Sequence, residues 1–328
     1  MAVVKSNAYG HDLSQYAMHI KESVDWFGVD SMAEARTLRR AGIKNPILVL
    51  GYTLPELYSE AARLKVSLSF FNAEERALVA KHPTLKVHLK IDTGMHRQGI
   101  YVKDLPLFLK GISAFQIEGV YTHFAGAKDK KFRPYTIAQI ENFKKASALV
   151  CEKQPNALRH ASATSAVVNY PDSYFDMVRV GAGIYGLGLS KNLPLKTEQV
   201  LSWTSLIGQV KEVEKGDYIG YDLTEKVFEK TKIAVVPIGY WHGFARNLSH
   251  VGEVLVRGRR AKVLGIVSMD AFVIALPKNT PVRVGDKVTL IGKDGKECIT
   301  VREMAKKLQT VDSEITTKIN PLVPRVFV

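Results

Sequence analysis

The stretch Ala2-Val-Val-Lys-Ser-Asn-Ala-Tyr-Gly-His11 opens the chain with a short apolar run that ends in a lysine. Short β-type runs of this kind recur through the first half of the sequence, and helical patterns separate most of them. The eight runs span residues 2–5, 26–30, 46–50, 67–71, 86–92, 116–122, 158–161 and 176–180. Strands that alternate with helices predict a parallel sheet, and eight is the number that closes a TIM-type (β/α)8 barrel.

The helical patterns of this half occupy the gaps between the strands. They predict helices over 11–22, 31–41, 54–64, 73–82, 102–110 and 136–152, and a shorter one that opens near Thr164. Thr136 and Gln139 have the spacing of a capping box for the longest helix. Seven helices leave the groove between the last and first strands uncovered, so we expect that a helix once preceded Ala2 and is missing from this chain.

The second half has a different pattern, in which apolar and polar residues alternate. Runs at 202–213, 232–238, 252–256, 261–267, 271–276 and 287–291 predict antiparallel strands. Thr300 and Glu303 predict a cap for a helix over 301–308, and a second helix covers 313–318. We therefore predict an α/β barrel domain over 1–194, followed by a mainly antiparallel β-rich domain over 195–328.

Composition excludes several classes of protein. The chain has 328 residues of which 46% are hydrophobic, which is too many for a disordered protein. No apolar run reaches the roughly 18 residues of a membrane span, and the start is too short and polar for a signal peptide. Cys151 and Cys298 lie far apart and form no CxxC pair. A disulfide scaffold and a cysteine zinc site are thereby excluded, no catalytic metal is expected, and a cytoplasmic location is predicted.

The chain has 46 basic and 32 acidic residues and therefore a net charge of +14, which raises the question of whether the protein binds nucleic acid. The basic residues are scattered, and the densest runs, at 128–133 and 257–262, fall in predicted loops without an aromatic stacking motif. We predict no nucleic-acid partner and a surface that attracts anionic ligands. The run from Gly181 to Gly186 matches GxGxxG, but no helix start follows it, which disfavours a dinucleotide fold.

The catalytic residues of a barrel of this type lie at the C-terminal ends of its strands. Those ends carry an amine, two arginines, an imidazole and several hydroxyls, at Lys5, Arg97, His123, 162–165 and Arg179. The set suits an anionic, phosphate-bearing ligand and an amine that binds it covalently. A lysine inside a barrel mouth loses water, and we expect this to lower the pKa of Lys5 and free its amine. On the fifth strand, His88 and Lys90 alternate with apolar neighbours and are predicted to point into the barrel.

Six motifs, in this order, carry a resemblance that covers nearly the whole chain. They are the stretch 2–11 quoted above, Lys90-Ile-Asp-Thr-Gly-Met-His-Arg97, Gly119-Val-Tyr-Thr-His-Phe-Ala125, Met177-Val-Arg-Val-Gly-Ala-Gly-Ile-Tyr-Gly186, Pro237-Ile-Gly-Tyr240 and Ser268-Met-Asp270. On these motifs the chain resembles the alanine racemase family of pyridoxal 5'-phosphate (PLP) enzymes, apparently without the usual N-terminal segment. The resemblance implies interconversion of L-alanine and D-alanine, which supplies D-alanine for peptidoglycan.

The resemblance also implies roles for the cofactor-binding residues. Lys5 looks like the lysine that binds PLP covalently, and His123 looks like the imidazole beside the ring. Arg179 resembles the arginine at the pyridine nitrogen, where its permanent charge prevents ring protonation and weakens the electron sink. The phosphate would be held by Tyr9, Ser165 and the backbone amides near Gly181 and Ala182.

Substrate handling is implied for residues of both halves. Arg97 resembles the arginine that faces the substrate carboxylate. Met269 resembles the residue whose backbone contacts the same carboxylate. Racemisation needs two bases on opposite faces, and Lys5 and Tyr240 look like that pair, for the D-face and the L-face proton respectively. Tyr240 would enter the site of the partner subunit, which implies a head-to-tail homodimer with composite sites. The Arg179–His123 pair is expected to lower the pKa of Tyr240.

The sequence departs from the family at several positions that bear on cofactor affinity. Trp241-His242 replaces Ala-Asp, Thr164 stands where Asn is common, and Pro321 stands where many members have a phosphate-binding tyrosine. Lys90, buried near Arg97, is expected to be carbamylated as in some family members. Three alternatives stay open: a racemase of serine or of many amino acids, a non-catalytic PLP-binding homologue, and a decarboxylase on the same barrel.

Overall fold

The computed structural model describes residues 1–110, 113, 116–188 and 197–328, which form two compact units. The first unit is built on Met1–Ile184 and the second on Tyr185–Gly188 together with Glu198–Val328. The predicted domain boundary between 194 and 195 falls outside the described residues. Within the described part of the chain, no helix combines the length and apolar character needed to span a membrane.

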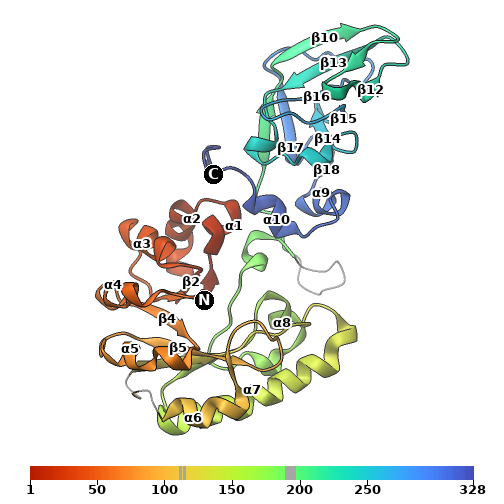
Figure 1. Cartoon of the computed structure of the whole chain (residues 1–328). Coiled ribbons are helices and arrows are strands. Elements are labelled where there is room, and N and C mark those ends of the chain that lie inside the picture. The colour runs from red at the N-terminus through yellow and green to blue at the C-terminus, as the bar shows by residue number, and fades with distance from the viewer. Residues whose placement is uncertain (111–112, 114–115, 189–196) are drawn as a thin grey trace. The chain divides into compact units, whose positions relative to one another are not determined.

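The first unit contains the parallel sheet that the sequence predicted (Figure 1). A short strand β6 (Ile100–Tyr101) pairs with the end of β5. The strands along the sheet, in order, are β1 (Ala2–Val3), β2 (Phe27–Val29), β3 (Ile47–Val49), β4 (Val66–Phe70), β5 (Val87–Asp92), β7 (Ile117–Tyr121) and β8 (Leu158–His160).

The predicted eighth strand at 176–180 is wrong as a continuous strand. Its residues make two isolated parallel bridges, Val180 with Ala2 and Arg179 with Ala163, so the segment links the β8 side of the sheet to β1. The extended stretch is short because a 3-10 turn begins directly after it, at Ala182–Tyr185. The barrel architecture is confirmed, and its last gap is spanned by these two bridges.

Helices follow the strands in the predicted order. They are α2 (Leu13–Ile20), α3 (Met32–Arg40), α4 (Tyr58–Arg63), α5 (Arg76–Ala80), α6 (Leu105–Leu109), α7 (Arg133–Lys153) and α8 (Thr164–Asn169). The capping box predicted for α7 is wrong, because the helix begins three residues before Thr136, with Pro134 in its first turn. The Gln139 side chain instead accepts a hydrogen bond from the amide of Ala125 at 2.9 Å.

The barrel interior is polar, which positions the site. Along β5 the apolar Val87, Leu89 and Ile91 are buried against the helices, while His88 and Lys90 point inward, as predicted. The ring of His88 meets the ring of His160 with centroids 5.0 Å apart. These side chains form a charged and hydrogen-bonding axis where many proteins have only aliphatic packing.

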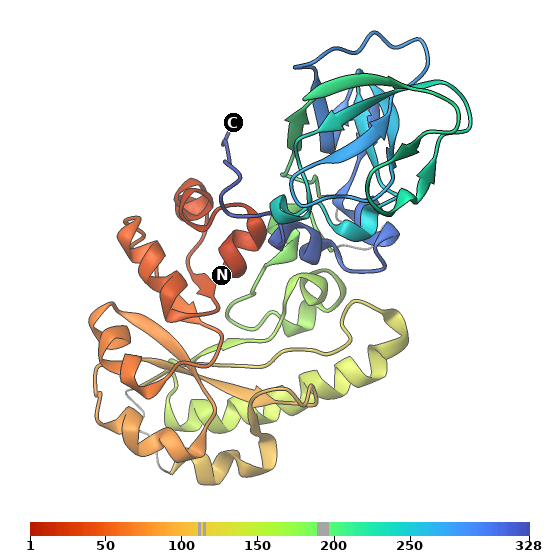
Figure 2. The ribbon, with the colours of Figure 1, turned by 45° about the horizontal axis from the view of Figure 1, so that its top comes forward.

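The second unit is antiparallel, as predicted (Figure 2). The predicted run 202–213 is two strands that break at Ile207-Gly208 and pair with different neighbours. Thr300 accepts a hydrogen bond from the amide of Glu303 at 3.0 Å, which confirms that cap. The strands in sheet order are β10 (Gln209–Val213), β13 (Thr231–Val236), β16 (Phe272–Ala275), β15 (Arg259–Leu264), β14 (Glu253–Val256), β17 (Lys287–Asp294) and β18 (Glu297–Ile299), with β9 (Trp203–Leu206) on β17.

A small hairpin and two short helices also belong to this unit. A hairpin of β11 (Tyr218–Ile219) and β12 (Glu225–Lys226), which the sequence pattern missed, lies outside the main sheet. The predicted C-terminal helices are α9 (Val301–Lys307) and α10 (Asp312–Thr317). The core of the unit includes a stacked pair of rings, Phe244 and Phe272, whose centroids are 4.4 Å apart.

Candidate active site

A pocket of about 760 Å³ opens at the C-terminal ends of the strands of the first unit. All the site residues that the sequence predicted for this unit line it: Lys5, Tyr9, Arg97, His123, Ser165, Arg179, Gly181 and Ala182. Its charged lining residues are five cations, Lys5, Lys90, Arg97, Lys128 and Arg179, and one carboxylate, Asp30. This excess of positive charge suits an anionic ligand.

Lys5 is presented by a left-handed turn. Strand β1 ends at Val3, and in α1 (Lys5–Gly10) the four residues from Ser6 to Tyr9 have φ between 52 and 56°. Left-handed backbone costs about 1–2 kcal/mol per residue for L-amino acids, so the turn needs support. That support comes from Glu34, which accepts hydrogen bonds from the amides of Ser6 at 2.6 Å and Asn7 at 3.3 Å.

The amine of Lys5 is ion-paired and partly exposed. Its Nζ donates to Oδ1 of Asp30 at 3.0 Å, and the side chain keeps 38% of its accessible surface. The expectation of a desolvated lysine is therefore wrong in this structure. Asp30 directly follows β2 and reaches the mouth beside Lys5, and its carboxylate keeps the pair at the solvent edge.

At the predicted phosphate end of the pocket, Tyr9 approaches the backbone of Gly181. A Cβ at Gly181 would lie 2.6 Å from the Tyr9 hydroxyl, so only glycine admits the phenol there. Thr164, one of the departures from the family, accepts hydrogen bonds from the amides of Gly181 at 3.2 Å and Gly183 at 3.3 Å. The Gly181 amide that the sequence assigned to phosphate thus already has a partner.

Arg179 is buried and lines the pocket. Its Nη1 donates to Nδ1 of His160 at 2.9 Å, and its Nη2 donates to the carbonyl oxygens of Thr122 at 2.7 Å and Ala161 at 2.9 Å. Desolvation lowers the pKa of Arg179 to about 10, which leaves the guanidinium charged at neutral pH.

His123 stands next to this guanidinium, with Nδ1 3.4 Å from Nη2 of Arg179. Burial, followed by the positive charge of Arg179, lowers the pKa of His123 to about 3. The imidazole is therefore neutral at physiological pH. Because Nδ1 faces a donor, the ring proton sits on Nε2. The predicted Arg179–His123 pair is thus brought together in the structure.

Lys90 points into the barrel behind Arg97. Its Nζ donates to Oε1 of Gln98 at 2.9 Å and lies 5.6 Å from the ring centroid of Tyr121. Desolvation, followed by the charges of Arg97 and Arg179, lowers the pKa of Lys90 to about 8. A fraction of this amine is therefore neutral and nucleophilic near pH 7.

The second unit carries Tyr240 and Met269, which the structure places next to each other. The amide of Tyr240 donates to the carbonyl oxygen of Ser268, and the amide of Trp241 to that of Met269, both at 3.1 Å. A Cβ at Gly239 would lie 2.2 Å from the Met269 carbonyl oxygen, so this close approach requires glycine. The side chains of Tyr240 and Met269 are exposed.

The other departures from the family adjoin this segment. The side chain of Asn320 donates to the carbonyl oxygen of Trp241, and its amide donates to that of His242, both at 3.1 Å. Pro321 follows directly, so Trp241, His242 and Pro321 belong to one contiguous part of the second unit.

A further exposed tyrosine was missed by the sequence reasoning. Tyr221 begins a turn over Tyr221–Leu223 in which Asp222 and Leu223 have φ of 58 and 52°. Its side chain is 66% exposed, more than that of Tyr240. The signal available in the sequence was an aromatic residue in a Gly-Tyr-Asp turn between two polar strands.

A lysine and two arginines around a pocket at the mouth of a parallel barrel define a site for a phosphate-bearing cofactor that binds an amine. The chain belongs to the alanine racemase family: the family's N-terminal domain matches residues 1–188 and its C-terminal domain matches residues 200–327.

Individual relatives match along the full chain. Alanine racemase from Symbiobacterium thermophilum is 39% identical over 339 residues, covering 100% of this chain and 90% of that protein. The crystal structure of alanine racemase from Bacillus anthracis with bound L-Ala-P has a TM-score of 0.93 at 38% identity, covering 100% of this chain and 87% of that one. Histidine racemase from Leuconostoc mesenteroides subsp. sake has a TM-score of 0.90 at 30% identity, covering 100% and 91%.

The family is PLP-dependent, and the residues of the first unit fit this cofactor. Lys5 supplies an amine, Arg179 a buried cation, and Tyr9 and Ser165 supply hydroxyls on one side of the pocket. A side chain at Gly181 would collide with the Tyr9 hydroxyl, so this glycine lets the phenol lie against the backbone that lines the pocket. Among the described residues, no group of three or more His, Cys, Asp or Glu is placed to hold a metal ion.

Proposed function

We propose that this protein interconverts L-alanine and D-alanine. The observation that carries the proposal is the convergence of Lys5, Arg97 and Arg179 on one pocket of a chain in the alanine racemase family. PLP, when bound, stabilises the negative charge that develops on the substrate's α-carbon. The protein itself must then remove a proton from one face of that carbon and supply one to the other.

Lys5 is the base for the first face in this proposal, since it lies at the barrel mouth. The second base is a tyrosine of the second unit. Tyr240 is the sequence-based choice, and its backbone lies beside Met269, the proposed carboxylate contact. Tyr221 is a competing candidate because it is the more exposed phenol. Arg97 would hold the substrate carboxylate through paired N–H donors.

Arg179 is proposed to face the pyridine nitrogen of the cofactor. A guanidinium that keeps its proton cannot pass it to the ring. The neutral His123 next to it adds no second proton source at physiological pH. We infer that this pair limits electron withdrawal by the cofactor and so disfavours side reactions such as transamination.

The assembly, location and biological role are further parts of the proposal. A head-to-tail homodimer would let the tyrosine and Met269 of one subunit complete the pocket of the other. Exposed aromatic side chains on the small hairpin of the second unit and just after it, at Tyr218 and Phe228, support an interface there. The D-alanine formed in the cytoplasm would serve peptidoglycan synthesis.

Lys90 is proposed to be carbamylated. The reaction adds CO2 to the neutral amine, releases a proton and leaves a carbamate anion. The position favours this, because an anion next to Arg97 and Arg179 replaces a buried cation that repels both. The carbamate would then hold the Arg97 guanidinium in place.

The test is formation of D-alanine from L-alanine by the purified protein with PLP, measured beside L-serine and L-histidine under the same conditions. Conversion of alanine with the highest kcat/KM supports the proposal. If the protein binds PLP but has a higher kcat/KM for serine or histidine, that amino acid would replace alanine as the proposed substrate. Bound PLP with no racemisation of any of the three would overturn the proposed activity.

A further inference from the structure

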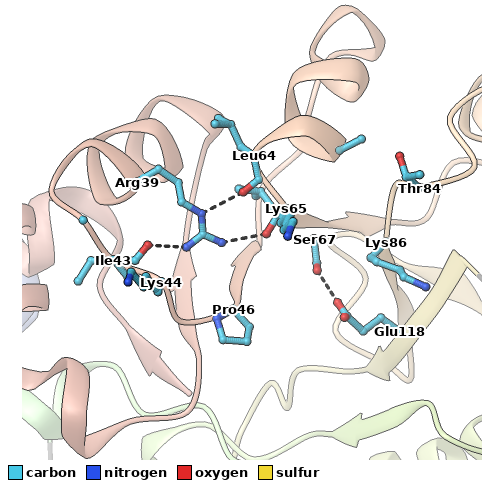
Figure 3. Close-up of a pocket in the computed structure, with 13 residues that line it drawn as sticks. Arg39, Ile43, Lys44, Pro46, Leu64, Lys65, Ser67, Thr84, Lys86 and Glu118 are labelled. Atoms are coloured by element: carbon cyan, nitrogen blue, oxygen red, sulfur yellow. Dashed lines mark hydrogen bonds between the residues drawn. The ribbon is translucent and has the colours of Figure 1, made fainter.

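A second pocket opens at the opposite, N-terminal ends of the barrel strands (Figure 3). It has a volume of about 980 Å³, and Arg39, Lys65, Lys86 and Glu118 are among its lining residues. The guanidinium of Arg39 donates four hydrogen bonds, to the backbone carbonyl oxygens of 43, 45, 64 and 65. The acidic group in this pocket is Glu118, whose carboxylate accepts a hydrogen bond from Ser67 (Figure 3).

Glu118 begins a line of side chains that ends at Arg179, which we call the axial network: Glu118, His88, His160 and Arg179. Oε2 of Glu118 lies 3.5 Å from Nε2 of His88, and Nδ1 of His88 lies 2.8 Å from Nε2 of His160. Nδ1 of His160 lies 2.9 Å from Nη1 of Arg179. Within the described part of the chain, Nε2 of His88 is buried and makes no hydrogen bond, and the carboxylate of Glu118 faces it at 3.5 Å as an ion-pair contact.

The direction of every proton in the axial network follows from its two ends. A guanidinium only donates, so Nδ1 of His160 accepts and its proton sits on Nε2. That proton is donated to Nδ1 of His88, which places the His88 proton on Nε2, facing the carboxylate of Glu118. Both histidines are therefore neutral Nε2–H tautomers, and the three donors point from Arg179 toward Glu118.

The surroundings hold this geometry. A Cβ at Gly119 would lie 2.4 Å from Nδ1 of His88, so only glycine leaves room for the ring. Tyr121 stacks on His160 with centroids 4.9 Å apart and planes 6° apart, and Trp26 meets His88 edge-on at 5.2 Å. Neither imidazole can turn without displacing a neighbouring ring.

We propose that Glu118 is a positioning residue for Arg179, acting from the far end of the barrel through His88 and His160. Its carboxylate faces the Nε2 proton that these tautomers place on His88, and it stabilises the buried guanidinium charge. The described residues place no carboxylate in direct contact with Arg179, so Glu118 is the anion to which its hydrogen bonds lead. The consequence for catalysis rests on the proposed function, in which Arg179 faces the cofactor.

The charges around Glu118 agree with this role. Burial raises the pKa of its carboxyl, but the contact with His88, the hydrogen bond from Ser67 and the charge of Lys86 outweigh that effect and lower the pKa. Burial holds the pKa of His88 below its usual value and that of His160 well below it. At neutral pH the axial network thus has an ionised end on each side and two neutral imidazoles between them.

The first test uses the cofactor-free protein labelled with ¹⁵N-histidine. We expect two buried imidazoles in the Nε2–H form in the wild type, and in E118Q the same tautomers with a shifted Nε2 signal of His88, because its proton then faces an amide in place of a carboxylate. E118D should restore the wild-type pattern, and K44Q, which alters another lysine of the same pocket, should retain it. Unchanged imidazole signals in E118Q would overturn the proposal, whether or not the protein racemises alanine.

The second test uses the PLP-loaded protein. We expect E118Q to shift the visible absorption of the bound cofactor and to lower kcat by about tenfold with little change in KM. Thermal unfolding confirms that E118Q is folded before it is compared. Equal spectra and kcat in E118Q and K44Q would overturn the link between Glu118 and the cofactor site.

Discussion

Nζ of Lys5 lies 3.0 Å from Oδ1 of Asp30, and the amide of Asp30 donates at 2.8 Å to the same Glu34 carboxylate that supports the turn after Lys5. The lysine, its counter-ion and the left-handed turn therefore share one anchor on α3. A substitution at Glu34 is therefore expected to displace both the amine of Lys5 and its ion-pair partner Asp30.

Replacing Lys5 by alanine separates function from stability. We expect racemase activity to fall by at least about 10²–10⁴-fold, because a positioned base contributes that much. The free energy of unfolding should change by less than about 1 kcal/mol, since a partly exposed ion pair contributes little. Measurements of D-alanine formation and of urea unfolding check both. K128A, a second lysine of the same pocket lining, is the control and should retain activity.

The E34Q variant should weaken the turn. The amide of glutamine cannot accept at both of its ends, so at least one of three backbone N–H groups loses its partner. We expect a loss of about 1–3 kcal/mol in unfolding free energy and slower uptake of PLP. Stopped-flow absorbance of the cofactor-free protein measures the uptake. E60Q, whose carboxylate pairs with Arg36 away from the pocket, is the control. Equal uptake rates in the two variants would contradict this account.

The two candidate tyrosines can be distinguished by Y240F and Y221F. Loss of the phenolic base on one face should lower kcat by about 10²-fold or more in the variant that carries the base, and leave the other close to wild type. Conversion of L-alanine and of D-alanine in deuterium oxide shows which face has lost its proton transfer. If both variants showed similarly small effects on kcat, neither Tyr240 nor Tyr221 would be the second base.

Subunit mixing tests the composite site. A hybrid dimer of K5A with the inactive tyrosine variant has one intact pocket, so mixed and re-equilibrated protein should regain about a quarter of wild-type activity. Mixing K5A with K5A is the control and should regain none. No recovery from the first mixture, with hybrid dimers shown by mass spectrometry, would mean that each subunit builds its own site.

Lys90 should give stability an unusual pH dependence. Its pKa is about 8 in the fold against 10.5 in the unfolded chain. Between these values the unfolded chain binds a proton that the folded chain does not, so the free energy of unfolding rises with pH, by at most about 1.4 kcal/mol per pH unit. K90M should remove this rise. Chemical unfolding at pH 7 to 10 in carbonate-free buffer checks it, and an identical rise in K90M would refute the assignment.

Carbamylation of the same amine is checked with ¹³C-bicarbonate. About a tenth of an amine with a pKa of 8 is neutral at pH 7, which is enough for CO2 to add. We expect a carbamate ¹³C signal in the wild type that is absent from K90M and present in K86Q. A crystal structure with an unmodified amine at Lys90 would contradict the proposal.

Sequence periodicity predicted the features that depend on local rules. The alternation along β5 correctly turned His88 and Lys90 inward, and the Thr300 cap was found because its partner is three residues away. The start of α7 was misplaced because Thr136 fits a capping box, whereas Pro134 suits the first turn equally well and the helix extends back to include it. The prediction of a continuous eighth strand over 176–180 was wrong, because the structure has only two isolated bridges there.

Other features depend on residues far apart in the sequence, and no local pattern contains them. The left-handed turn after Lys5 requires Glu34, and the exposed amine of Lys5 requires Asp30. The axial network requires Glu118, His88, His160 and Arg179 from four parts of the barrel. The roles of Tyr240 and Met269 in catalysis remain sequence-based proposals, and the candidacy of Tyr221 rests on its exposure in the structure.

The left-handed turn from Ser6 to Tyr9 also has a consequence for folding order. An unfolded chain seldom places four consecutive L-residues in this backbone region, and local contacts alone do not offset the cost. The turn can therefore persist only after α3 has docked and presented Glu34. The reactive lysine then acquires its position late in folding, so partly folded chains would not offer a formed aldehyde-binding site to free PLP.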